Sequence, residues 1–205
     1  PAQTVAAPET VAVGGAATRV AGHGVLEGVT GALRRLVSHD LMPAWARAMP
    51  SAAAALPATV REGAAAVYFS ACVNRIFGAA PGRPARPSLP EALVAVSARA
   101  GQPLWIPADV AGHCCATVWH SKGYEEANTL AANRTVESLW RWTDSGALPV
   151  VCDASSCSFG LVSEIVPYLT AENRARHARL TLLDSIAWVH DRLLPALSVH
   201  RRVGS

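Results

Sequence analysis

The chain has 205 residues, of which 51% are hydrophobic and 16% charged, and its mean hydropathy is +0.22. It is too apolar for an intrinsically disordered protein and long enough to form one sizeable core. The formal net charge is +3 and the 18 basic residues are scattered, so no nucleic-acid partner is expected. No run reaches the roughly 20 apolar residues of a membrane span, and no secretion signal is visible. We expect a cytoplasmic protein, either free or associated with the inner face of the membrane.

Three parts are expected along the chain. Residues 1–21 are Ala-, Pro- and Gly-rich and predict a disordered or extended lead. Residues 22–60 form a helical lead segment, in which a helix with apolar residues on one face precedes short turns broken by prolines. Residues 61–205 form an α/β domain. Because the chain begins with Pro and stops just after a helix-like run, our working assumption is that it is a piece of a longer protein.

The first strand and helix of the domain have clear signals. Residues 64–69 are continuously apolar, which predicts a strand buried on both faces. Ser88 and Glu91 have the spacing of a capping box, and Gly101 stands where a C-cap belongs. We therefore expect a helix from Leu89 to Ala100.

The same strand-then-helix pattern follows twice more. Short apolar runs at 103–107 and 148–152 predict the second and third strands, and apolar residues recur at helical spacing after each. A last helix is expected from one apolar stripe, made of Leu182, Ile186, Val189, Leu193 and Leu197. Three strand–helix repeats predict a parallel sheet covered by helices. The expected fold is therefore a Rossmann-like three-layer α/β unit (βαβαβα) with additional N- and C-terminal helices.

Five cysteines fall at the ends of these predicted strands and none on a predicted helix. They are separated by 41, 0, 36 and 4 residues and are Cys72, Cys114, Cys115, Cys152 and Cys157. Since the carboxyl ends of parallel strands share one edge of a sheet, the thiols are expected to converge there. Soft thiolates indicate an iron–sulfur cluster or zinc. Cys152 lies inside an apolar run, so a plain core role remains an alternative for it, and a vicinal disulfide in the adjacent pair would be strained.

Three motifs carry a resemblance to a known family. Residues 68–78, 112–124 and 151–157 resemble the cysteine-rich CCG domain. This domain occurs in the iron–sulfur regions of FAD-linked D-lactate and glycolate oxidising enzymes, anaerobic glycerol-3-phosphate dehydrogenase and heterodisulfide reductase. The sequences around Asn74 and around Asp153 most resemble those of bacterial D-lactate dehydrogenases that carry flavin and iron–sulfur regions on one polypeptide. The resemblance covers about residues 64–197.

The resemblance implies roles for the cysteines. It makes Cys72, Cys114, Cys115 and Cys157 ligands of a cluster of the 4Fe-4S type or of zinc, with Cys152 where some relatives place a further cysteine. Two departures stand out. Relatives have Gly after the cysteine pair where this chain has Ala116, and they carry the cysteine pattern twice, beside ferredoxin-like segments. The chain resembles the first CCG half alone.

Other candidate residues have two interpretations each. His113 is either a further ligand or donor to a cluster sulfur, or a loop histidine with its own partners. Lys122, the only lysine, either balances an anionic site or is solvated. Asp153 is expected to cap a turn. No phosphate-binding glycine loop, Ser-His-Asp set or carboxylate pair is found, so no catalytic residue is assigned.

Three functions follow from these observations. In the first, the chain is the iron–sulfur electron-transfer module of an FAD-linked D-2-hydroxy acid dehydrogenase, relaying electrons from flavin toward a quinone or cytochrome. FAD would then be bound by a separate flavin domain, with a ferredoxin-like domain and a second CCG half as further partners. In the second, the chain binds zinc for structure or handles thiols and disulfides, as in heterodisulfide reductase relatives. In the third, it is a metal-free docking domain.

Overall fold

A computed structural model describes residues 22–39, 44–45, 50–79 and 86–197. The chain divides into two compact units. The first unit comprises residues 1–55 and 73–88, and the second comprises 56–72 and 89–205. The lead expected over residues 1–21 lies outside the described residues. No helix in the described ranges is long and apolar enough to cross a membrane.

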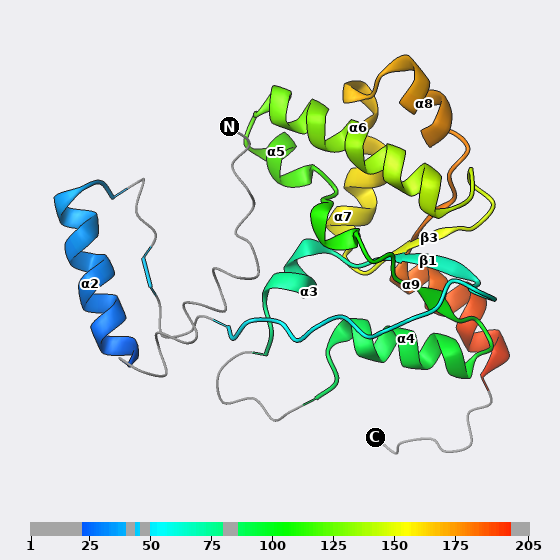
Figure 1. Ribbon diagram of the computed structural model, residues 1–205, viewed down its shortest axis with the longest axis horizontal. Coiled ribbons are helices and arrows are strands. Elements are labelled where there is room, and N and C mark those ends of the chain that lie inside the picture. Colours follow the sequence, from blue (N-terminus) through cyan, green and yellow to red (C-terminus); the bar gives the residue numbers. More distant parts are fainter. Residues whose placement is uncertain (1–21, 40–43, 46–49, 80–85, 198–205) are drawn as a thin grey trace. The chain divides into compact units, whose positions relative to one another are not determined.

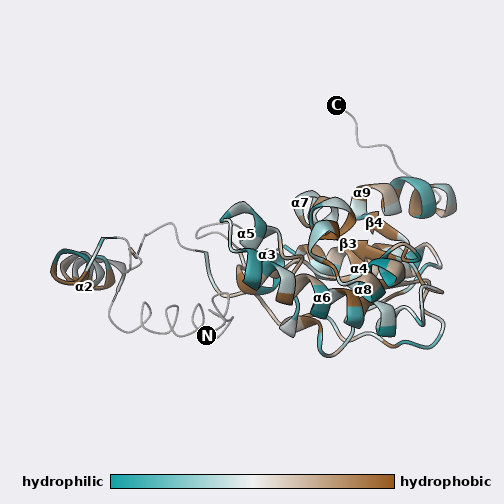
Figure 2. Ribbon diagram, turned by 90° about the horizontal axis from the view of Figure 1, so that it is seen from above, coloured by the Kyte–Doolittle hydropathy of each residue, from teal (hydrophilic) through white to brown (hydrophobic). Residues whose placement is uncertain are grey.

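The described residues of the first unit include the amphipathic helix α2 (His23–Leu36). The predicted apolar face is present but exposed, with Val25 and Val29 each more than half accessible, and Figure 2 shows both hydrophobic and hydrophilic colouring on this helix. The helical lead does not continue beyond it in the described residues, because residues 50–60 contain no helix. Instead, Ala52 forms an antiparallel bridge with Phe77.

The second unit is built on a four-stranded parallel sheet in the order β2-β1-β3-β4. Its strands are β1 (Ala66–Phe69), β2 (Leu104–Trp105), β3 (Val150–Cys152) and β4 (Leu182–Asp184). From β1 the chain passes to β2 on one side and later returns to β3 on the other. The strand order therefore reverses beside the carboxyl ends of β1 and β3, where open α/β sheets bind ligands.

Alternate residues of β1 point into two separate cores. Val67 and Phe69 pack in a cluster with α6 (Glu125–Trp142), whereas Ala66 and Tyr68 pack with residues of α4 (Leu89–Arg99) and α9 (Ser185–Trp188). Figure 1 shows α6 on one side of the sheet and α4 with α9 on the other. Burial on both faces explains why the strand is continuously apolar in sequence.

Further short helices lie between the strands. They are α3 (Cys72–Ile76) after β1, α5 (Thr117–Ser121) after the cysteine pair, α7 (Ser155–Phe159) after β3, a π-helical segment Gly160–Glu164 that continues α7, and α8 (Ala171–His177). The segment before the cysteine pair is a 3-10 turn at Val110–Gly112.

The predicted strands at 64–71, 103–107 and 148–152 are confirmed in shorter form, as is the helix after Pro87. Gly101 has a φ of 68° and ends that helix as expected. The single helix predicted from Leu182 is wrong, because Leu182–Asp184 is a fourth strand and the helix begins at Ser185. Pairing with β3 buries part of this segment, and Asp184 caps the following helix by accepting from the N–H of Ile186 at 2.8 Å.

Candidate metal centre

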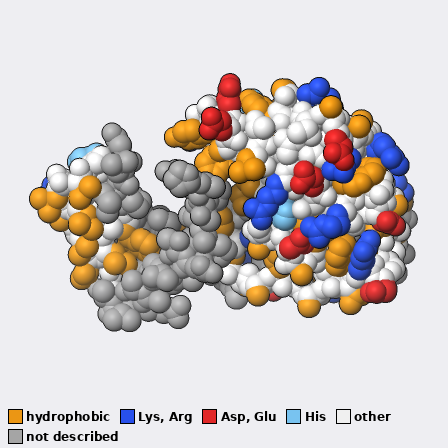
Figure 3. All heavy atoms as spheres, turned by 45° about the horizontal axis from the view of Figure 1, so that its top comes forward, with side chains coloured by type: hydrophobic (Ala, Val, Ile, Leu, Met, Phe, Trp, Pro, Cys, Tyr) orange, Lys and Arg blue, Asp and Glu red, His pale blue; other side chains and the backbone are white. Residues whose placement is uncertain are grey.

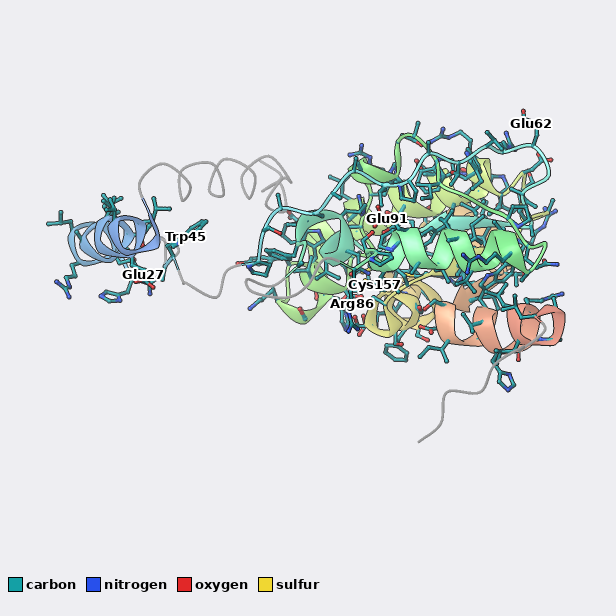
Figure 4. The ribbon with its side chains drawn as sticks, turned by 90° about the horizontal axis from the view of Figure 1, so that it is seen from below. Glu27, Trp45, Glu62, Arg86, Glu91 and Cys157 are labelled. Carbon is teal, nitrogen blue, oxygen red and sulfur yellow. The ribbon has the colours of Figure 1, made fainter. Side chains whose placement is uncertain are left out.

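The cysteines lie at the predicted edge of the sheet, but two of them are on helices. Cys72 is the first residue of α3, and Cys157, which is labelled in Figure 4, lies within α7. Cys152 is the last residue of β3, and Cys114 and Cys115 follow the 3-10 turn. The expectation that no cysteine would be helical is wrong, because α3 and α7 begin within three residues of their strands. Because α3 and α7 begin so close to the strand ends, Cys72 and Cys157 still lie near the edge of the sheet.

The five thiols form a continuous series of contacts. Cys72 interacts with Cys114, Cys114 with Cys115, Cys115 with Cys157, and Cys157 with Cys152. None forms a disulfide; Cys115, Cys152 and Cys157 are buried and the other two are half-buried. Thiols that are distant in sequence are therefore neighbours.

The pKa values of the thiols in this series shift in opposite directions. Hydrogen bonds from the Cys114 and Cys157 thiols lower the pKa of Cys115, and the backbone N–H of Thr117 adds to this effect. The same hydrogen bonds to Cys115 raise the pKa of Cys114 and of Cys157. These two hydrogen bonds therefore favour the thiolate form of Cys115. A thiolate is both the metal-binding and the nucleophilic form of cysteine.

The geometry does not form a site for one metal ion. Among the described residues, no group of three or more His, Cys, Asp or Glu side chains is arranged to hold a single ion. A zinc site needs four ligands about 2.3 Å from one point, whereas these sulfurs follow one another in a series. An iron–sulfur cluster bonds each thiolate to a different iron atom.

A buried hydroxyl beside the series also fits a bound group. Thr117 Oγ1 is buried next to Cys115, yet no group in the described part of the chain is placed to complete a hydrogen bond with it. Such unpartnered buried donors cost about 1–3 kcal/mol. An added acceptor at the sulfurs would remove that cost.

Ala116 links the cysteine pair to α5 in a left-handed conformation. Its φ is 68° and its side chain is fully buried. A non-glycine residue in this region costs roughly 1–2 kcal/mol. The glycine expected from the family at this position thus has a direct explanation: the backbone needs a positive φ to turn from Cys115 into the helix.

Asp153 connects the two central strand ends. Its Oδ2 accepts hydrogen bonds from the Tyr68 hydroxyl at 2.5 Å and the Ser70 hydroxyl at 3.3 Å, and its Oδ1 accepts from the Ala71 N–H at 2.6 Å. Burial and then the negative charge of Asp153 raise the pKa of Tyr68 above its ordinary value. The simple turn cap expected from sequence is in fact a link that fixes Cys72, the residue after Ala71, beside β3.

Two residue types in the sequence are the signal for this link. A tyrosine in the middle of a buried apolar strand needs a partner for its hydroxyl, and Asp153 is a charged residue directly after another buried strand. The Asp153 carboxylate is the acceptor that the buried Tyr68 hydroxyl needs.

His113 has partners for both ring nitrogens. Nδ1–H donates to the Asp109 carbonyl at 2.9 Å, so Nε2 accepts from the Ser138 hydroxyl at 2.7 Å. The ring also packs edge-on against Trp142, with centroids 4.8 Å apart. Desolvation lowers the pKa of His113, so the neutral form is favoured. These contacts match the interpretation of His113 as a loop histidine with its own partners, and they leave neither nitrogen for a metal.

Lys122 is exposed and forms the C-cap of α5. The structure places it on the solvent side of the helix that follows the cysteine pair. This position matches the solvated alternative considered for it. The face of the molecule drawn in Figure 3 carries Lys and Arg side chains interspersed with Asp and Glu.

Comparison with known proteins gives no assignment. No family model, no curated protein and no solved structure matches this chain.

Proposed function

We propose that this chain is an iron–sulfur electron-transfer module of an FAD-linked D-2-hydroxy acid dehydrogenase of the D-lactate type. The observation that carries the proposal is the unbroken series of five thiols at the carboxyl edge of the parallel sheet. The series lies beside the point at which the strand order reverses, and α/β folds bind ligands at such points. The proposal includes a Rossmann-like three-layer fold for the second unit and membership of the CCG family.

Four cysteines would hold the cluster: Cys72, Cys114, Cys115 and Cys157. The fifth, Cys152, is the last residue of β3 and belongs to the buried core. When bound, the cluster supplies one-electron transfer. The chain contributes three buried thiols and an apolar core cluster that includes Cys115 and Cys157, which limit solvent access and so influence the reduction potential.

The flavin chemistry is assigned to another domain. The sequence contains no dinucleotide-binding glycine fingerprint, so we expect FAD and the hydroxy acid to bind elsewhere. The proposed partners are a flavin domain, a ferredoxin-like cluster domain and a second CCG half, with a quinone or cytochrome as acceptor. The chain alone should not oxidise D-lactate, and measurable turnover by it in the presence of an artificial acceptor would contradict this division of roles.

A second function is favoured by the state of Cys115. Thiol–disulfide exchange begins with attack by a thiolate, and hydrogen bonds from the Cys114 and Cys157 thiols favour that form of Cys115. The alternative is therefore a zinc-binding or thiol/disulfide-handling domain, as in heterodisulfide reductase relatives. In that case Cys115 would attack a disulfide and form a mixed disulfide, releasing one thiol. Cys114 or Cys157 would then attack Cys115 in the mixed disulfide, which releases the second thiol and leaves a disulfide within the protein.

Metal analysis separates the two functions. The chain should be purified anaerobically and then assayed for iron, acid-labile sulfide and zinc together with its visible spectrum. A brown protein with comparable iron and sulfide supports the electron-transfer module. A colourless protein with zinc supports the alternative. A protein that binds neither after anaerobic reconstitution would refute both metal assignments.

A further inference from the structure

Three residues carry the buried side-chain oxygen and nitrogen atoms that lack a hydrogen-bond partner within the described part of the chain. They are Thr117 through Oγ1, Glu164 through Oε2, and Asn128 through both Oδ1 and Nδ2. The Asn128 side chain is fully buried. Burying a polar atom without a partner costs free energy, and native structures therefore satisfy almost all such atoms with protein groups or ordered water.

The oxygens of Thr117 and Glu164 lie close to one another. Thr117 is the first residue of α5 and Glu164 is the last residue of the π-helical segment, and these two elements pack together. A β carbon added to Gly160 would be 2.0 Å from Thr117 Oγ1 and 3.3 Å from Glu164 Oε2. Both oxygens therefore lie beside the same residue, within the distance that one water molecule bridges.

Asn128 approaches the same region from the first turn of α6. Its N–H donates to the Tyr124 carbonyl at 2.9 Å, and the Tyr124 N–H donates to the Trp119 carbonyl of α5 at 3.0 Å. Asn128 shares a face of α6 with Thr135, which is two helical turns further on. The Thr135 hydroxyl donates to the Cys114 carbonyl at 2.9 Å. That face of α6 is therefore turned toward the segment that leads from Cys114 into α5.

We propose that Asn128, Thr117 and Glu164 together bind internal water between α5, α6 and the π-helical segment. The hydrogen-bonding character of the four atoms selects this ligand. A cation would leave Asn128 Nδ2–H without an acceptor, and an anion would leave Asn128 Oδ1 and Glu164 Oε2 without a donor. Water both donates and accepts, and a buried water makes about three hydrogen bonds to groups of this kind. The site requires no iron–sulfur cluster, so it is independent of the proposed function.

Nuclear magnetic resonance tests the site directly in the whole chain labelled with nitrogen-15. The Asn128 side-chain amide should give cross-peaks to water of opposite sign in nuclear Overhauser and rotating-frame spectra, which distinguishes long-lived bound water from proton exchange. Asn173 is the matched control, because its buried amide donates to Asn133 Oδ1 at 2.9 Å and to Glu137 Oε1 at 3.1 Å. It should give no such peaks. The absence of these peaks at Asn128 would overturn the proposal.

Urea unfolding gives a second test, in which the sign of the change decides. Asn128→Leu keeps the branching of the side chain but removes its donor and acceptor. We expect a lower unfolding midpoint, as for Asn173→Leu, because hydrogen bonds to the water are lost. If the Asn128 amide had no ligand, an apolar replacement would instead relieve an unsatisfied group and raise the midpoint. A raised midpoint would therefore rule out water at Asn128.

A double-mutant cycle tests whether the residues share this water. Once Asn128→Leu has removed part of the site, Thr117→Val should lower the midpoint by less than it does in the wild-type chain. Glu164→Gln, combined with Asn128→Leu, should show the same reduced effect. Asn128→Leu and Asn173→Leu, which share no partner, should be additive. Additive losses for Asn128 with both Thr117 and Glu164 would mean separate sites and would contradict the shared one.

Discussion

The Tyr68 hydroxyl donates a 2.5 Å hydrogen bond to Asp153 across a separation of 85 residues. The two residues belong to neighbouring central strands or their ends, and the same carboxylate accepts from the Ala71 N–H. One buried side chain thus fixes the starting point of α3, where Cys72 lies. The position of Cys72 at the sheet edge therefore depends on Asp153.

Asp153→Ala should destabilise the protein by roughly 2–5 kcal/mol. The change leaves the Tyr68 hydroxyl and the Ala71 N–H buried without an acceptor, and each orphaned donor costs about 1–3 kcal/mol. Urea unfolding followed by circular dichroism measures the loss. Asp191→Ala serves as the control, since Asp191 is largely exposed, and a loss no larger than in that control would show that the network contributes little.

Cys115→Ser should abolish cluster retention while the helices persist. Cys115 contacts both Cys114 and Cys157, and a hydroxyl is a poor replacement for a soft thiolate ligand. Cys152→Ser is the matched comparison, because Cys152 is at the end of the series and is expected to lose much less iron. Iron per chain and far-ultraviolet circular dichroism are the measurements. Equal iron loss in both variants would mean that all five thiols serve the site.

Ala116→Gly should maintain or slightly raise stability, although it deletes a buried methyl. Relief of the left-handed strain, roughly 1–2 kcal/mol, offsets the loss of about 0.8 kcal/mol for the buried methyl. Ala132→Gly, at a fully buried position within α6, has no such compensation and should be clearly destabilising. Thermal unfolding of the two variants tests the contrast. Similar losses in both would rule out strain at Ala116.

Stability should fall on acidification through the titration of His113. Its pKa is lowered in the folded state, so the unfolded chain binds the proton more readily as the pH drops below about 6.5. The stabilisation by neutral His113 is complete above that pH and is lost toward the folded pKa. Urea unfolding at pH 7.5 and 5.5 should show a smaller decrease for His113→Gln than for wild type. His190→Gln, at an exposed site, should behave like wild type, and an unchanged decrease in His113→Gln would contradict the assignment.

The sequence predicted the parts of the fold that have strong local signals. The strand at Ala66–Phe69 is a continuous apolar run, and the helix from Leu89 ends at a glycine with positive φ. The strand at Leu182–Asp184 was missed because Leu182 and Ile186 have helical spacing and the strand has only three residues. Asp184 as a helix cap was the signal that could have separated strand from helix.

The location of the site was also predictable, but its internal order was not. Parallel strands ending at one edge are enough to bring Cys72 and Cys157 together. Which thiol contacts which depends on side-chain rotamers and on helices that begin directly after the strands. No local pattern reveals that Gly160 lies beside Thr117, where a β carbon added to the glycine would be 2.0 Å from Thr117 Oγ1.

The edge strand β4 sets a practical limit on dissecting this protein. Asp184 accepts from the Ser158 hydroxyl at 2.8 Å, next to Cys157, and Trp188 donates to Ser97 from a fully buried position. A shorter version cut before Leu182 would keep every cysteine but lose the neighbour of β3 and a large part of the core under α4. Any shorter version that keeps this core must therefore extend at least through Leu193, which is itself fully buried.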